Sequence, residues 1–274
     1  MSGTGSNSSA AVAVGLRDVS VTLGGNRILK NVSVDFGAGV TSGLIGPNGA
    51  GKTTLLNYIC GIVPSVSGTR TILGRDATAL PPHGMIRSGL ARTFQGAQFV
   101  GELTAVENVM LGYHIRTPLN LLTAALRTPG ARRLEAGARE AALAAMERAG
   151  IADLADRQIS QLSFGNQKKV DLARALVAQA PCILLDEPMA GLSVEEKDSM
   201  CAVLTGLRDS GGPTIIIVEH DMRVVGQLCV RTAVLDAGEL IAEGPTADVL
   251  NAKAVIEAYM GGAAEKAGSA AQAS

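Results

Sequence analysis

A glycine-rich stretch near residue 50 has the composition and spacing of a loop that binds phosphate. It fits the pattern G-x-x-x-x-G-K-[ST] and comprises Gly46, Pro47, Asn48, Gly49, Ala50, Gly51, Lys52, Thr53 and Thr54. Glycine has no Cβ, so backbone N–H groups in such a loop can turn toward a polyphosphate. Lys52 can reach the β- and γ-phosphates, and the Thr53 hydroxyl can bind Mg²⁺, an ion that prefers oxygen ligands. The stretch therefore predicts a site for ATP with Mg²⁺.

Two later runs of apolar residues end in side chains that can act on a bound triphosphate. Residues 182–185 are followed by Asp186 and Glu187, and residues 214–218 repeat the design and lead to His220. Continuous apolar runs of this length indicate strands buried on both faces, and the C-terminal ends of parallel strands share the sheet edge where ligands bind. We expect Asp186 to be the second anchor of Mg²⁺, Glu187 to be the base for the attacking water, and His220 to contact the γ-phosphate.

Each of these assignments has a structural alternative. The glycine-rich stretch could be an ordinary turn, Asp186 and Glu187 could cap a turn as exposed carboxylates, and His220 could be a hydrogen-bonded histidine at a strand end. The flanking segments favour the phosphate loop, because an apolar pair, Leu44-Ile45, precedes it and a helix-like run, residues 55–59, follows it. A helix that begins near Lys52 would also direct the positive end of its dipole toward the phosphates.

A second helix start that can bind an anion lies more than one hundred residues later, in the segment Leu162, Ser163, Phe164, Gly165 and Asn166. Ser163 and Gly165 at a helix N-terminus can bind phosphate, although Ser163 alone is equally well explained as an N-cap. One chain would then hold two phosphate-binding helix ends for one nucleotide. A dimer resolves this difficulty, because each of these segments would serve the ATP of its partner.

The patterns around these segments predict an α/β fold. Alternation from Leu16 to Phe36 with a turn at residues 24–26 indicates an antiparallel β layer, to which residues 69–73 can add a strand. Helical patterns dominate from about 97 to 165, where Thr104 and Glu107 form a capping-box pattern and apolar residues recur at helical spacing from Leu134 to Ala149. Residues 118–130 favour a short helix, with a packed loop as the alternative.

Composition sets limits on the kind of protein. The 274 residues carry a net charge of −1, which provides no general basic field for nucleic acid, and no apolar run approaches the roughly 18 residues of a membrane span. The four cysteines form no C-x-x-C pair, a cytosolic pattern that suggests neither a zinc site nor a disulfide framework. We expect flexible tails at residues 1–12 and 262–274 around one ATPase domain at residues 13–261.

Taken together, these motifs resemble an ATP-binding cassette (ABC) ATPase, the nucleotide-binding domain of ABC transporters, from about Leu16 to Gly261. The fold implied is that of a P-loop NTPase with a mostly parallel core sheet, an antiparallel β subdomain and a helical subdomain inserted at about 97–165. Residues 46–54 match the Walker A motif, and 162–166 match the signature segment, which would act in trans. Gln95 in RTFQ matches the Q-loop, which implies a catalytic role and a place beside Thr53 and Asp186 as a metal ligand. The D-loop matches Ala190, Gly191, Leu192 and Ser193.

Three kinds of departure from the family pattern affect the expected contacts. Leu23 occupies the place of the aromatic residue that stacks on adenine, so we expect weaker base stacking. Phe164 and Asn166 stand where Gly and Gln are common, and Ser193 stands where Asp is commoner.

Five sequence segments resemble, more narrowly, the ATPase subunits of branched-chain amino acid importers. They are ARTFQ, LTAVENVMLGYH, DEPMAGLS, VEHDM and EAYMGG. This resemblance implies a second ABC ATPase subunit in a heterodimer, with a homodimer as the alternative. It also implies transmembrane permease subunits, an indirect link to an extracytoplasmic solute-binding protein, no nucleic acid, and a peripheral place on the cytoplasmic face of the membrane. Other cargo, such as urea, amides or lipid-linked material, is one alternative, and a soluble ABC ATPase outside transport is another.

Overall fold

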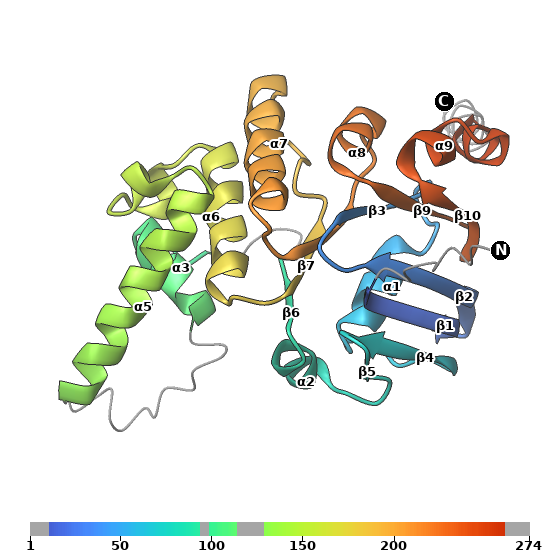
Figure 1. Cartoon of the computed structure of the whole chain (residues 1–274), viewed down its shortest axis with the longest axis horizontal. Coiled ribbons are helices and arrows are strands. Elements are labelled where there is room, and N and C mark those ends of the chain that lie inside the picture. Colours follow the sequence, from blue (N-terminus) through green and yellow to red (C-terminus); the bar gives the residue numbers. More distant parts are fainter. Residues whose placement is uncertain (1–10, 94–98, 114–128, 261–274) are drawn as a thin grey trace, which may run out of the picture.

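The strands of two β-sheets lie toward one side of the molecule and a group of helices lies toward the other (Figure 1). The computed structural model describes residues 11–93, 99–113 and 129–260. Gln95, residues 118–128 of the ambiguous segment and most of both predicted tails lie outside the described residues. Residue 12, the last of the predicted N-terminal tail, already belongs to the first strand.

The first sheet is antiparallel and confirms the predicted β layer. Its strands, in the order β2-β1-β4-β5, are β1 (Val12–Leu23), β2 (Asn26–Gly37), β4 (Ser67–Ile72) and β5 (Arg75–Asp76). Gly24 and Gly25 join β1 to β2 with φ angles of 56° and 83°, which match a tight hairpin turn that favours glycine.

The second sheet is mostly parallel and carries the strand ends that the sequence singles out. Its order is β10-β9-β3-β8-β7-β6, and only β10 runs antiparallel to its neighbour. The strands are β3 (Thr41–Ile45), β6 (Leu90–Arg92), β7 (Cys182–Asp186), β8 (Thr214–Val218), β9 (Arg231–Asp236) and β10 (Glu239–Pro245). Every residue of β3, β7 and β8 is buried, as the apolar runs predict.

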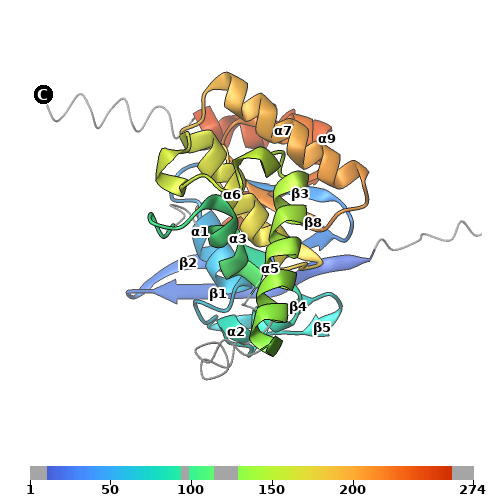
Figure 2. The same cartoon turned by 90° about the vertical axis from the view of Figure 1, so that its left-hand side faces the viewer.

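Helices cover this sheet and form a separate group beside it. The described helices are α1 (Lys52–Ile59), α2 (Pro82–Arg87), α3 (Ala105–Tyr113), α5 (Pro129–Arg148), α6 (Phe164–Val177), α7 (Val194–Asp209), α8 (Met222–Leu228) and α9 (Thr246–Leu250), with 3-10 turns η1 (Ala152–Leu154) and η2 (Ile159–Gln161). Residues 253–260 are also helical. Helices α3, α5 and α6 pack together on one side of the molecule (Figure 2), so the helical group continues past residue 165 to the end of α6.

Alternate residues of the buried strands face two different hydrophobic cores. In β8, Ile215 and Ile217 pack with the helices α6 and α7, whereas Ile216 and Val218 pack with α1 and the antiparallel sheet. The capping box predicted before α3 is present, because Thr104 N donates to Glu107 Oε2 at 2.8 Å and Glu107 N donates to Thr104 Oγ1 at 3.3 Å. No helix among the described residues is long and apolar enough to cross a membrane.

Candidate nucleotide site

The phosphate loop connects β3 to α1, and its first and last glycines, Gly46 and Gly51, lie close to neighbouring residues. Gly51 precedes α1 with a φ of 99°, and a Cβ there would lie 2.8 Å from Leu29 Cδ2. Gly46 has a φ of 151°, and a Cβ there would lie 2.1 Å from Leu235 O. The loop therefore has a shape that only glycine permits at both positions.

Lys52 lies folded over this loop. Its side chain is buried, and Nζ donates to Gly46 O at 2.7 Å and to Pro47 O at 2.9 Å. Burial lowers the pKa of Lys52, while the nearby carboxylates of Glu187 and Asp186 oppose that shift. The lysine charge is thus held beside the loop carbonyls and close to the acidic pair. Thr53 is exposed and Thr54 is half-buried at the start of the helix.

Asp186 ends β7 in a buried ion pair that the sequence does not reveal. Its Oδ2 accepts a hydrogen bond from Arg92 Nη2 at 2.7 Å, and Arg92 Nη1 donates to Asn57 Oδ1 of α1 at 2.7 Å. The other carboxylate oxygen, Asp186 Oδ1, is buried and has no hydrogen-bond partner among the described residues. A buried carboxylate oxygen without a protein partner, in a site that also offers a threonine hydroxyl, fits the ligand preference of Mg²⁺.

The structure brings Glu187 and His220 together at the carboxyl ends of neighbouring strands. His220 Nε2 lies 3.0 Å from Glu187 Oε1. Glu187 has a φ of 49°, a left-handed conformation that is costly for a residue with a side chain, and its N–H donates to Val218 O at 3.0 Å. Strained residues of this kind concentrate at functional sites, and the role of Glu187 as a base beside His220 stays a prediction.

Glu219 binds backbone groups on either side of this pair, although its position in the sequence suggests no role. Its carboxylate is 2% exposed and accepts hydrogen bonds from Met189 N at 2.8 Å and His220 N at 3.3 Å. Burial raises the pKa of Glu219, and the two backbone hydrogen bonds partly offset that shift. The side chain thereby ties the turn after Glu187 to the start of the histidine segment.

The signature segment and the D-loop contact each other. Ser163 caps α6 by accepting a hydrogen bond from Asn166 N at 3.3 Å, as the N-cap interpretation predicts. Glu196 of α7 joins the two segments, because its Oε1 accepts from Gly165 N at 3.2 Å and its Oε2 accepts from Ser193 N at 3.1 Å. In this protomer the Glu196 carboxylate therefore accepts the hydrogen bond of Gly165 N–H, a group that we expect to bind the phosphate held by a partner.

Side chains complete this surface. Phe164 is 51% exposed, and its ring comes so close to Gly191 that a Cβ there would lie 2.9 Å from Phe164 Cε1. Leu162 and Leu192 are buried, whereas Ala190 and Ser193 are exposed.

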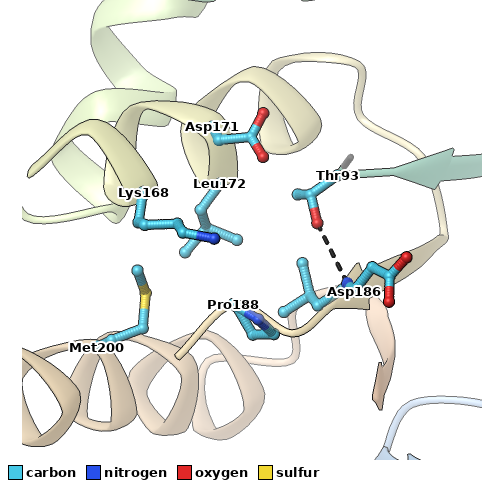
Figure 3. A pocket seen from close by; sticks show the side chains of 8 residues that line it. Thr93, Lys168, Asp171, Leu172, Asp186, Pro188 and Met200 are labelled. Carbon is cyan, nitrogen blue, oxygen red and sulfur yellow. Dashed lines mark hydrogen bonds between the residues drawn. The ribbon is translucent and has the colours of Figure 1, made fainter. Parts of the chain in front are cut away.

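A small pocket separates α6 from the end of β7 (Figure 3). Its lining residues come from α6, β7, the turn after β7, α7 and the residue after β6, and they are Thr93, Lys168, Asp171, Leu172, Leu185, Asp186, Pro188 and Met200. Thr93 Oγ1 accepts a hydrogen bond from Asp186 N at 3.4 Å. The pocket therefore lies beside Asp186 and Thr93.

Helix α6 also contacts Phe99. Arg174 forms an ion pair with Asp171 at 2.5 Å, and its guanidinium lies 5.3 Å from the centre of the Phe99 ring. Burial raises the pKa of Asp171, while Arg174 lowers it. Asp171 thus lines the same pocket as Thr93, and Arg174 lies over Phe99, so α6 lies beside both of these described residues.

Leu23 lies at the end of β1 and is 39% exposed, whereas Val19 and Val21 of the same strand are fully buried. Its side chain is therefore accessible at the place expected for the adenine contact.

The sequence of the chain matches the model of a known protein family. The family model described as ABC transporter matches residues 29–190. The chain belongs to the ABC transporter family.

Curated ABC relatives cover most of the chain. It is 36% identical to the high-affinity branched-chain amino acid transport ATP-binding protein LivG of Salmonella typhimurium, over 87% of this chain and 93% of that protein. It is 32% identical to the protein of the same description, BraF, of Pseudomonas aeruginosa, over 89% of this chain and 95% of that protein. It is also 34% identical to the lipopolysaccharide export system ATP-binding protein LptB of Escherichia coli, over 86% and 92%.

Solved ABC structures share the fold. The ADP conformation of MJ1267, an ATP-binding cassette of an ABC transporter, superposes with a TM-score of 0.78 at 28% identity and covers 91% of this chain and 99% of its own. A dimeric post-hydrolysis state of the cassette MJ0796, bound to ADP and Pi, gives 0.71 at 27% identity over 85% and 98%. The chain is thus the nucleotide-binding ATPase cassette of a transporter, and the predicted fold class is confirmed.

Proposed function

We propose that this cassette hydrolyses ATP with Mg²⁺ to energise the import of branched-chain amino acids. The observation that carries the catalytic part is the 3.0 Å contact between Glu187 and His220 at the strand edge, next to the buried Asp186 and to Lys52. The cargo is supported by the names of the LivG and BraF relatives, which cover most of this chain.

In this mechanism each side chain has a separate task. Lys52 leaves the loop carbonyls and binds the β- and γ-phosphates, so its charge offsets theirs. Glu187 accepts the proton of the attacking water. His220 contacts both the Glu187 carboxylate and the γ-phosphate and keeps them aligned for the attack. Asp186 Oδ1 and Thr53, with Gln95, would hold Mg²⁺, which when bound neutralises charge on the phosphates. Positioning and electrostatics supply most of the rate enhancement in reactions of this type.

We further propose that the complete site needs a second cassette. Ser163 and Gly165 would bind the γ-phosphate held by the partner, and the D-loop residues 190–193 would face the partner across the interface. Support comes from the contact between the signature segment and the D-loop and from the dimeric state named for the MJ0796 relative. The partner would be a different ATPase subunit in a heterodimer.

The remaining proposals concern the place of the cassette in the transporter. Residues 13–261 would be one ATPase domain, and the surface around α3 would receive a cytoplasmic segment of a transmembrane permease. The cassette would lie peripherally on the cytoplasmic face of the membrane, and a solute-binding protein would act on the other side through the permease.

The catalytic part is tested by Glu187→Gln. ATP hydrolysis should fall about 10²- to 10⁴-fold because a general base is lost, while ATP binding is retained. Glu140→Gln, at an exposed position on α5, should leave both unchanged. Wild-type turnover by Glu187→Gln would show that another group activates the water.

The cargo is tested by transport. A deletion strain complemented with this chain should take up labelled leucine and not urea or short amides. The LptB relative favours lipid-linked material as a second candidate. Recovery of surface lipid export in the same strain, without leucine uptake, would establish that candidate and refute import.

A further inference from the structure

The last described helix returns to the first residue of the phosphate loop. Tyr259 Oη accepts a hydrogen bond from Gly46 N at 2.7 Å, across 213 positions of sequence. The ring of Tyr259 packs against the core formed by the helices and the parallel sheet. Burial raises the pKa of Tyr259 from its ordinary value of 10 to about 12, and the hydrogen bond from Gly46 N opposes this shift.

The peptide units of Gly46 are held on several sides. Its N–H is bound by Tyr259, its C=O accepts the hydrogen bond from Lys52 Nζ, and its Cα lies against Leu235 O. A chain of contacts therefore runs from Tyr259 through Gly46 to Lys52. When Lys52 moves to the phosphates, Gly46 loses one of these contacts and depends more on Tyr259.

A second anchor holds the loop further along. Gly238, in the turn between β9 and β10, donates from its N–H to Ala50 O at 3.1 Å. The contact at Gly46 N is made by the side chain of Tyr259, whereas the contacts of Leu235 and Gly238 come from the backbone. A substitution can therefore remove that one anchor and leave the others in place.

We propose that Tyr259 is a positioning residue of the nucleotide site. Its hydroxyl holds the start of the phosphate loop in the shape that binds phosphate, and nucleotide binding in turn orders the helix of residues 253–260. This inference rests on the proposed binding of nucleotide at residues 46–54. It adds the C-terminal helix, which carries none of the motifs that define the site, to the groups that determine nucleotide affinity.

The first test separates the hydroxyl from the ring. Tyr259→Phe keeps the aromatic packing and removes only the hydrogen bond to Gly46. ADP affinity, measured by calorimetry on the full chain, should fall about 3- to 10-fold, the effect of one lost hydrogen bond. The KM for ATP should rise by a similar factor, while kcat at saturating ATP stays unchanged.

A matched control is available in the same chain. The hydroxyl of Tyr58 is buried and has no hydrogen-bond partner among the described residues. Tyr58→Phe therefore removes the same atom without removing a described hydrogen bond, and its ADP affinity should equal that of the wild type.

The second test measures coupling by hydrogen exchange. In the wild type, ADP should slow amide exchange in residues 253–260, and in Tyr259→Phe this additional protection should be lost. If Tyr259→Phe binds ADP like the wild type, or exchanges faster in this helix to the same extent with and without ADP, Tyr259 only anchors the helix and the proposal is wrong. Failure of the proposed ATPase function would appear separately, as normal turnover by Glu187→Gln.

Discussion

The buried pair of Arg92 and Asp186 gives a quantitative test of how the acidic strand end is supported. The Arg92 side chain is 9% exposed and that of Asp186 is 1% exposed, with 2.7 Å between Nη2 and Oδ2. Arg92→Met keeps much of the volume and leaves a buried carboxylate without its cation. Breaking a buried pair from one side costs about 3–5 kcal/mol. At about 2–4 °C per kcal/mol for a chain of this size, a loss of about 4 kcal/mol lowers the melting temperature by about 8–16 °C.

An exposed ion pair of the same length provides the control. Arg139 Nη2 and Asp156 Oδ1 are also 2.7 Å apart, but their side chains are 46% and 81% exposed. Solvent screens such pairs, so Arg139→Met should change the free energy of unfolding by less than about 1 kcal/mol. The two variants compare a buried and an exposed ion pair at the same distance and with the same substitution, and Arg92→Met also removes the hydrogen bond to Asn57 Oδ1.

The assay is thermal and urea unfolding of the nucleotide-free chain, followed by far-UV circular dichroism because the chain has no tryptophan. Asp186→Asn and the double variant complete a cycle. The double variant should lose about 1–3 kcal/mol less than the sum of the single variants, since each single variant leaves a buried partner behind. An Arg92→Met melting temperature within about 2 °C of the wild type, or additive losses, would refute the reasoning.

Three further predictions follow from burial and close contact. Burial raises the pKa of Glu219 above its ordinary value of 4.5, so the folded chain holds this proton more tightly than the unfolded chain. The stability from that proton is complete below pH 4.5 and is lost as the pH rises through the folded pKa. Urea titrations should therefore show Glu219→Gln gaining stability relative to the wild type as the pH rises from 4.5, and a difference independent of pH would contradict this. In Gly112→Ala the new Cβ would lie 2.3 Å from Arg174 O, so the free energy of unfolding should fall by about 1–3 kcal/mol. Gly137→Ala, with nothing within 4 Å, should raise it by about 0.5–1 kcal/mol, and equal effects would argue against a close α3–α6 contact. Leu23→Tyr should tighten ATP binding about 2- to 10-fold in calorimetry through stacking on adenine, and unchanged affinity would remove Leu23 from the base contact.

Much of the fold could be predicted because its patterns are local. The apolar runs in β7 and β8 reflect strands with both faces covered, which leaves no position for a polar residue until the strand ends. Gly24 and Gly25 mark a turn that needs positive φ, and Thr104 with Glu107 satisfies the first amides of α3. In each case the residues that interact are near one another in sequence.

The parts of the site that sequence reasoning missed depend on distant contacts. Arg92 stands three positions before Gln95, yet only the packing of β6 against β7 places it beside Asp186. Tyr259 and Glu196 reach Gly46 and Gly165 from other elements, and no spacing rule connects such pairs. Arg92 and Tyr259 do occur in the segments ARTFQ and EAYMGG, which resemble the importer subunits. That resemblance marks the two residues but gives no physical reason for their contacts.

The position of β3 in its sheet determines when the molecule can first hold nucleotide during synthesis. This strand of residues 41–45 is made early, but its two neighbours are β8 and β9, residues 214–218 and 231–236. Until both have left the ribosome, β3 has two unpaired edges, and the phosphate loop after it lacks the neighbouring strands that hold it in place. A nascent or truncated chain that ends before β9 should therefore depend on chaperones to avoid aggregation. Binding of ATP should reduce aggregation only of chains that already include β9.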